Sequence, residues 1–268
     1  MLASPDVCAA AIRASDVSEK DPICKTPLLE TVALGKDFRL GTREVRILEN
    51  INLKMKSGEL LTLLGKSGCG KSTLLSLLAG METPSRGEVR VEGISVKGPH
   101  PSRSILFQKP TLLPWLTVEE NIVFGAKLRG DTEDLKERAE QIIEGVELSG
   151  FEKLFPPKLS LGMAHRACLA RALLAKPKLL LLDETFASVD FILKESLCKT
   201  LMEAWHSDRF TVVLVTHNIE DALVFADRAV ILGGKPTTVK GLIDTSSDRC
   251  TSDLASLRSE ITGSFGNV

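Results

Sequence analysis

Short apolar runs alternate along the chain with longer amphipathic stretches. Five brief, largely apolar runs are predicted strands, most of them typical of strands buried in a parallel sheet: residues 60–64, 104–107, 178–183, 210–216 and 229–232. Alternating apolar and polar positions favour further strands near 31–34, 45–48, 51–55 and 88–91. The early part of the chain is thus expected to be rich in strands.

From Val118 to about Gly150 the pattern is helical. A charged stretch at 131–147 carries one apolar stripe, formed by Leu135, Ala139, Ile142, Ile143 and Val146. A second helix is expected at 159–175 and ends before Pro177. Strands that alternate with helices predict an α/β fold with a parallel sheet covered on both faces.

One glycine-rich turn lies between the apolar run at 60–64 and a leucine-rich stretch at 74–79. It fits the pattern G-x-x-x-x-G-K-[ST], with the residues Gly65, Lys66, Ser67, Gly68, Cys69, Gly70, Lys71, Ser72 and Thr73. Backbone amides and a helix N-terminus can cradle an anion there. We expect Lys71 to reach the β- and γ-phosphates of a nucleotide and Ser72 to contact Mg²⁺. A simple strand-to-helix turn is the alternative, which the matching flanks on both sides disfavour.

Composition narrows the classes of protein that fit. A formal net charge of -1 over 268 residues argues against binding of nucleic acid through bulk electrostatics. No apolar run approaches the roughly 20 residues that span a bilayer, and the start of the chain has no secretory signal pattern. Six scattered cysteines favour a reducing compartment over a disulfide framework.

Two carboxylates, Asp183 and Glu184, follow the apolar run at 178–183. We expect Asp183 to hold Mg²⁺ beside Ser72 and Glu184 to orient or deprotonate an attacking water. An acidic pair at the end of a strand is common on protein surfaces. Downstream of a phosphate loop, the catalytic interpretation is the stronger one.

Further motifs resemble the ATP-binding-cassette (ABC) family over about residues 31–235. Leu-Ser-Leu-Gly-Met at 159–163 resembles the family's signature, and Ala-Ser-Val-Asp at 187–190 its D-loop. Gln108 resembles the Q-loop glutamine that contacts Mg²⁺ and the attacking water, and His217 the switch histidine that senses the γ-phosphate. Phe38 is a candidate for the aromatic residue that stacks on adenine.

The resemblance implies an α/β P-loop NTPase core of ABC type, with an antiparallel β subdomain and an inserted α-helical subdomain. The expected bounds are an N-terminal lead-in at 1–30, an ATP-binding domain at 31–238 and a C-terminal tail at 239–268, with the helical subdomain at about 109–172. It also implies that two cassettes pair head to tail and that Ser160 and Gly162 of each approach the ATP held by the other. ATP and Mg²⁺ are the implied ligands.

The run Leu-Leu-Pro-Trp-Leu-Thr-Val at 112–118 resembles the nitrate, sulfonate and taurine importer branch. In relatives this segment touches the membrane subunit, although Trp115 could equally pack in the core of the helical subdomain. Met163 and Phe186 agree with that branch. The implied function is the peripheral ATPase subunit of an importer for a small anionic solute, on the cytoplasmic face of the cell membrane. Its implied partners are a second cassette, an integral-membrane permease and, indirectly, a solute-binding protein; no nucleic acid is expected.

Several positions depart from the family pattern. Leu161 replaces the first signature glycine and Ala164-His165 the usual Arg-Gln. Thr185 stands where the importer branch usually has proline, and Ala187-Ser188 where it has Gly-Ala. If position 161 requires a positive φ, a leucine there costs about 1–2 kcal/mol; if it does not, the change is mild. These departures leave open a degenerate cassette that binds ATP as a regulatory ligand, hydrolyses it weakly and pairs with a more active cassette. A soluble cassette acting on ribosomes or DNA is a third hypothesis, disfavoured by the single phosphate loop and the charge balance.

Overall fold

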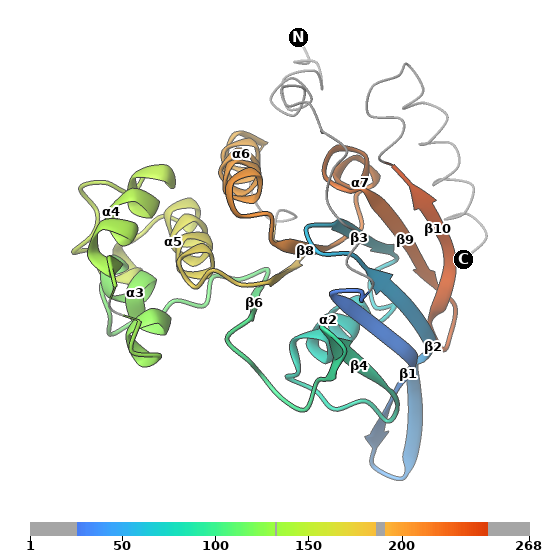
Figure 1. Ribbon diagram of the computed structural model, residues 1–268. Helices are drawn as coiled ribbons and strands as arrows, with labels where there is room; N and C mark the ends of the chain where they lie inside the picture. The colour runs from blue at the N-terminus through green and yellow to red at the C-terminus, as the bar shows by residue number, and fades with distance from the viewer. Residues whose placement is uncertain (1–25, 132, 186–190, 246–268) are drawn as a thin grey trace. The chain divides into compact units, whose positions relative to one another are not determined.

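The computed structural model describes residues 26–131, 133–185 and 191–245. Two compact units make up the chain (Figure 1). Unit 1 is built from the segments up to His100 and from Thr211 onward, and unit 2 from Pro101–Phe210. The second unit is therefore an insertion in the sequence of the first.

Unit 1 contains an antiparallel sheet with the strand order β2-β1-β4-β5. Its strands are β1 (Leu29–Leu40), β2 (Arg43–Met55), β4 (Arg86–Val91) and β5 (Ile94–Ser95). The separate strands expected near 31–34, 45–48 and 51–55 are parts of the long strands β1 and β2. Shifts of register between Thr31, Leu34 and Lys36 break the alternation of apolar residues along the chain, which is why the pattern looked discontinuous.

The second sheet region of unit 1 is mostly parallel. Strand β3 pairs in parallel with both β8 and β9, and β10 runs antiparallel to β9. The bounds are β3 Leu60–Gly65, β8 Thr211–Thr216, β9 Arg228–Gly233 and β10 Thr238–Asp244. Every residue of β3 and β8 is buried, as their apolar sequences predict.

Two described helices belong to unit 1, α2 (Lys71–Ala79) and α7 (Ile219–Phe225). Helix α2 begins directly after the loop that follows β3. Ala222 of α7 packs in a buried cluster with Leu64 of β3, Ala229 and Ile231 of β9 and Ile243 of β10. The loops after β3 and β8 thus extend from strands that are packed in a buried, apolar cluster.

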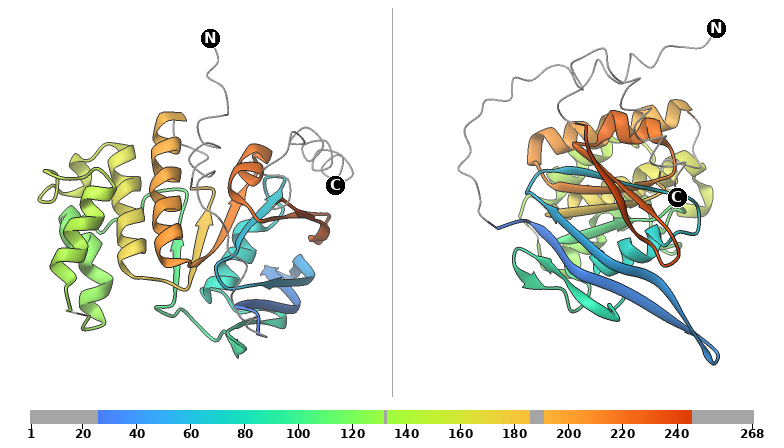
Figure 2. Two further views of the ribbon diagram at one scale, coloured as in Figure 1. Left: turned by 45° about the horizontal axis from the view of Figure 1, so that its top comes forward. Right: turned by 90° about the vertical axis from the view of Figure 1, so that its right-hand side faces the viewer.

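Unit 2 contains a parallel pair of strands and a group of helices. The bounds are β6 Arg103–Leu106, β7 Leu179–Asp183, α3 Val118–Leu128, α4 Leu135–Gly145, η1 Pro156–Lys158, α5 Leu161–Leu174 and α6 Phe191–Asp208. Helices α3, α4 and α5 lie side by side in the left-hand view of Figure 2 and share one buried core. None of the helices in the described ranges is long and apolar enough to cross a membrane.

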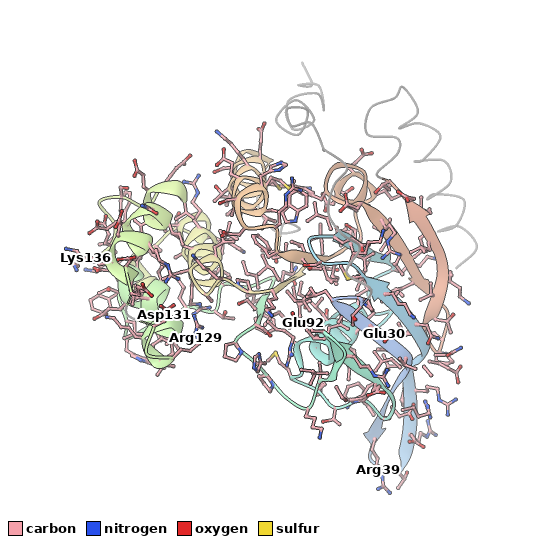
Figure 3. All side chains as sticks on the ribbon, in the orientation of Figure 1. Glu30, Arg39, Glu92, Arg129, Asp131 and Lys136 are labelled. Carbon is pink, nitrogen blue, oxygen red and sulfur yellow. The ribbon has the colours of Figure 1, made fainter. Side chains whose placement is uncertain are left out.

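The helical pattern from Val118 to Gly150 forms two helices, with a break between Leu128 and Leu135. Gly130 has a φ of 71°, a conformation typical of the glycine that ends a helix. The expected stripe lies inward: Leu135, Ala139 and Ile143 are buried. Lys136 projects from the outer face of α4 (Figure 3), and its side chain is almost fully exposed.

Candidate functional site

The glycine-rich turn connects β3 to the N-terminus of α2. Gly68 and Gly70 adopt left-handed conformations with φ values of 78° and 90°. A Cβ atom at Gly70 would lie 2.8 Å from Ile47 Cγ2, and one at Gly65 would lie 2.6 Å from Cys69 Sγ and 2.9 Å from the Leu232 carbonyl oxygen. Gly68 requires glycine for its backbone angle, Gly65 for the space beside it, and Gly70 for both.

Lys71 is the first residue of α2 and is only 4% exposed. Its Nζ donates hydrogen bonds to the carbonyl oxygens of Gly65, at 2.8 Å, and Lys66, at 3.2 Å. A buried ammonium is thereby held inside the turn, next to a helix N-terminus whose first turn has no acidic residue. Lys66, Ser67, Gly68 and Ser72 are exposed. The loop therefore fits an anionic phosphate group approaching from solvent.

His217 lies in the loop that follows β8. Leu64 pairs with Thr216 across the parallel strands β3 and β8, so the phosphate loop and His217 follow their strands at the same edge of the sheet. The Thr216 hydroxyl donates to the Asp221 carboxylate at 2.7 Å and accepts from the Asn218 amide at 3.0 Å. Both side chains of the Thr216–Asp221 pair are buried, which fixes the backbone on either side of His217.

Sequence reasoning missed the contribution of Asp221. The burial of Asp221 is not visible in the sequence, and no motif connects a threonine to an aspartate five residues later. Phe38, the candidate for stacking on adenine, lies on β1 in unit 1. The Lys36 ammonium lies 4.8 Å from the centre of its ring, which places a cation over the aromatic face.

In unit 2 the predicted catalytic residues leave the ends of two paired strands. Leu106 of β6 pairs with Leu182 of β7, so Gln108 and the pair Asp183–Glu184 emerge at the same edge. Gln108 is exposed and the two carboxylates are partly buried. Glu184 has a φ of 45°, in the left-handed region that residues with a side chain adopt uncommonly.

The signature segment begins helix α5. Ser160 is the N-cap residue, and its hydroxyl accepts a hydrogen bond from the Met163 amide at 3.2 Å. Leu161 is the first residue of the helix and is 56% exposed. A helical residue has a negative φ, so of the two alternatives for Leu161 the strained one is wrong. Gly162 is close to α6: a Cβ there would lie 2.9 Å from a Leu193 side-chain carbon.

The segment between Gln108 and α3 is organised by Asn121, which is fully buried in α3. Its amide group accepts from the Leu113 amide and donates to the carbonyl oxygens of Leu113, Leu116 and Thr117, at 2.8 to 3.0 Å. Trp115, at the turn of this segment, is 69% exposed. Packing of Trp115 in the helical core, one of the two open interpretations, is therefore wrong.

Thr117 and Glu120 close the same segment with a reciprocal capping box at the start of α3. Hydrogen bonds from the Thr117 backbone amide and hydroxyl hold the pKa of Glu120 below its ordinary value.

On α5, burial raises the pKa of the Cys168 thiol, so this cysteine is expected to be inert at neutral pH.

Some expected elements lie outside the described residues: Phe186, the D-loop candidate at 187–190, most of the N-terminal lead-in and most of the C-terminal tail. The described residues include no group of three or more His, Cys, Asp or Glu that would hold a metal ion by itself. The phosphate loop, with its buried lysine at the start of a helix, defines the chain as a P-loop nucleotide-binding protein.

Comparison with known proteins narrows this class. The model of the family described as ABC transporter matches residues 48–187. The ABC transporter ATP-binding protein MJ0412 of Methanocaldococcus jannaschii is 39% identical, over 82% of this chain and 83% of that protein. The aliphatic sulfonates import ATP-binding protein of Bacillus subtilis is 38% identical over 86% and 91%, and the taurine import ATP-binding protein of Burkholderia pseudomallei 42% over 70% and 73%.

Among solved structures, the chain is similar to a dimeric post-hydrolysis state of the ATP-binding cassette MJ0796 bound to ADP and Pi. The TM-score is 0.71 at 28% identity, over 81% of this chain and 98% of that one. The chain belongs to the ABC transporter family. The predicted fold class and the prediction of an ABC-type ATPase are confirmed.

Proposed function

We propose that this chain is the ATP-hydrolysing subunit of an importer for a small anionic solute of the nitrate, sulfonate or taurine type. The binding of a nucleotide is inferred from the buried ammonium of Lys71, the first residue of α2. This ammonium donates hydrogen bonds to the carbonyl oxygens of Gly65 and Lys66. A phosphate group offers this ammonium charged partners in place of neutral ones. The relatives named for sulfonate and taurine import support the transport part.

The proposed roles of individual residues follow the family resemblance. The phosphate loop from Gly65 to Thr73 binds the phosphates of ATP, and Phe38 stacks on the adenine. Glu184 orients or deprotonates the attacking water, with His217 and Gln108 as its catalytic companions. Ser72, Gln108 and Asp183 are oxygen-bearing residues of the kind that bind Mg²⁺ together with nucleotide phosphates. When bound, Mg²⁺ would neutralise the charge that develops on the phosphates.

We further propose that two copies pair head to tail, so that Ser160 and Gly162 of one chain approach the ATP bound by the other. The dimeric cassette of similar fold supports this arrangement. An unstrained Leu161 removes the main physical argument for a degenerate cassette. We also keep the domain bounds of 31–238 for the cassette and about 109–172 for its helical subdomain, with a lead-in at 1–30 and a tail at 239–268.

Hydrolysis is tested by measuring ATPase activity of the purified full chain at increasing protein concentration. Lys71→Ala should remove activity, whereas Lys97→Ala, an exposed lysine in unit 1, should not. Activity that rises more steeply than linearly with concentration is expected for a dimeric site. An inactive unmodified chain that still binds ATP would favour the regulatory cassette instead.

The permease partner is tested through the exposed Trp115, which the buried Asn121 network presents to solvent. A tagged chain should co-purify an integral-membrane protein from detergent-solubilised membranes of its own cells. Trp115→Ala should lose that partner, and Leu128→Ala, a change at another exposed apolar residue of unit 2, should keep it. Recovery of ribosomes or DNA in place of a membrane protein would overturn the importer proposal and the peripheral location at the cytoplasmic face of the membrane.

A further inference from the structure

The backbone that carries Gln108 is contacted by side chains from two other elements of unit 2. His165 on α5 is 2% exposed, and its Nε2 lies 3.2 Å from the Gln108 carbonyl oxygen. Thr185, which follows Glu184 and is 3% exposed, donates from its hydroxyl to the Leu106 carbonyl oxygen at 3.4 Å. The two contacts lie on either side of Phe107.

The His165 ring also connects the Gln108 segment to the signature. Its Nδ1 lies 2.9 Å from the carbonyl oxygen of Leu161, the first residue of α5. Both partners are carbonyl oxygens and a neutral imidazole carries one N–H, so the ring donates to one of them and lies against the other. The buried ring thus lies between the first turn of α5 and the Gln108 carbonyl. Because the ring is buried, losing these contacts would leave polar atoms without compensation from water.

Thr185 makes a corresponding connection to the catalytic acid. It follows Glu184, whose φ of 45° places it in the left-handed region. A proline at position 185 would bias residue 184 toward extended conformations and would have no hydroxyl to donate. The threonine allows the observed backbone and ties it to the end of β6.

The far end of the segment is fixed as well. Arg171, two turns further along α5 than His165, donates to the Thr111 carbonyl oxygen at 2.9 Å and to the Thr111 hydroxyl at 3.0 Å. Gln108 is thus exposed on a segment anchored at Leu106, at its own carbonyl and at Thr111.

We propose that His165 and Thr185 form a clamp that positions Gln108 relative to Glu184 and to the start of α5. His165 departs from the usual family sequence and Thr185 from that of the importer branch, and the two contact backbone carbonyls that are two residues apart. They are positioning residues, because they act through Gln108 and Glu184. The clamp rests on the proposed catalytic role of Gln108 and adds to it the means by which this chain sets the position of that side chain.

Amide hydrogen exchange of the unmodified full chain and its variants tests the clamp without any need for activity. His165→Asn retains a polar group near Nδ1 but none at the Nε2 position, and Thr185→Val removes the hydroxyl at constant shape. Each should speed exchange at Phe107, Gln108 and Lys109 by about tenfold, since local opening follows the loss of an anchoring contact. His165→Gln, which places a donor where Nε2 lies, and Thr185→Ser should exchange like the unmodified protein.

ATPase kinetics then test whether the clamp acts through Gln108. His165→Asn and Thr185→Val should each lower kcat about tenfold, the scale expected for a misplaced catalytic group. The KM for ATP should stay within about twofold. In a Gln108→Ala background neither change should lower kcat further, because the group that they position is absent.

Unchanged exchange in His165→Asn and Thr185→Val would overturn the clamp, as would a His165→Gln variant that behaves like His165→Asn. Losses of kcat that persist undiminished in the Gln108→Ala background would show that the two residues act elsewhere. An unmodified chain without ATPase activity would refute the proposed function alone, and the exchange measurements would still decide whether the segment is clamped.

Discussion

The phosphate loop of unit 1 and the signature segment of unit 2 both contain glycines in the family pattern, but the two sets of glycines do different physical work. Gly68 and Gly70 have positive φ values, and at Gly70 a Cβ would collide with Ile47. Leu161 occupies the position of a signature glycine at the first residue of a regular helix, with more than half of its surface exposed. Replacing a motif glycine by a larger residue is thus costly at Gly70 of the phosphate loop and mild at position 161 of the signature.

This comparison separates backbone requirements from contact requirements. In the loop around Lys71, Gly68 and Gly70 are required by their positive φ values, and contacts with neighbouring atoms add a second requirement at Gly70. At the signature, a glycine is required only where another surface approaches closely. Gly162 is such a position within unit 2, since a Cβ there would crowd Leu193.

The largest effect is expected at Glu184. A loss of turnover there would show that unit 2 contributes a catalytic residue despite the altered signature. Glu184→Gln removes the proposed general base while keeping the shape of the side chain. We expect turnover to fall by about 10²–10⁴-fold, the usual contribution of such a group. ATP binding should persist, and size-exclusion chromatography with ATP should show a stabilised dimer.

Glu144→Gln, a change at an exposed carboxylate on α4, is the matched control and should retain turnover. Near-normal turnover in Glu184→Gln would show that the catalytic acid has been wrongly assigned. The phosphate loop would keep its assignment, and a residue other than Glu184 would have to activate the attacking water.

The next effect tests the phosphate loop directly. Lys71→Ala removes a charged group that is buried and aimed into the loop. Loss of a charge-assisted contact of about 1.5–3 kcal/mol corresponds to roughly 10–150-fold weaker ATP binding. Fluorescence titration with a nucleotide analogue measures it, and unchanged affinity would contradict the assignment.

A smaller effect is expected from Gly70→Ala, which isolates the backbone requirement. The left-handed conformation alone costs a residue with a Cβ about 1–2 kcal/mol, and the contact with Ile47 adds to it. Thermal and chemical unfolding should show a lower free energy of unfolding.

Two other glycines calibrate that result. Gly68→Ala has the positive φ but open space around its Cβ, so it should lose less stability than Gly70→Ala. Gly98→Ala has neither problem and should be nearly neutral. Equal losses of unfolding free energy in all three variants would mean that neither backbone strain nor crowding explains why the loop contains glycine.

Leu161→Gly is expected to have the smallest effect and tests the signature segment. Glycine in the first turn of α5 should lower the free energy of unfolding by no more than about 1 kcal/mol. ATPase activity of the purified dimer should change by less than about twofold, because no backbone strain is relieved. A large gain in activity would show that Leu161 obstructs the partner's site and would restore the case for an impaired cassette.

The sequence alone determined the local elements around the phosphate loop, because an apolar strand, a glycine-rich turn and a helix start are each encoded by adjacent residues. It also indicated the acidic pair after β7 and the family to which the chain belongs. These features depend on short-range patterns and on motif order, both of which can be recognised without a structure.

Other features were decided by contacts between residues far apart in sequence. The length of β1 and β2 was hidden by register shifts, and the exposure of Trp115 depends on the buried amide of Asn121. The backbone of Leu161 became known only when its place in α5 was known. The contacts of His165 and Thr185 with the carbonyls near Gln108 join residues 57 and 79 positions apart. A one-dimensional pattern records which residues depart from a motif, but only the folded chain decides which atoms they meet.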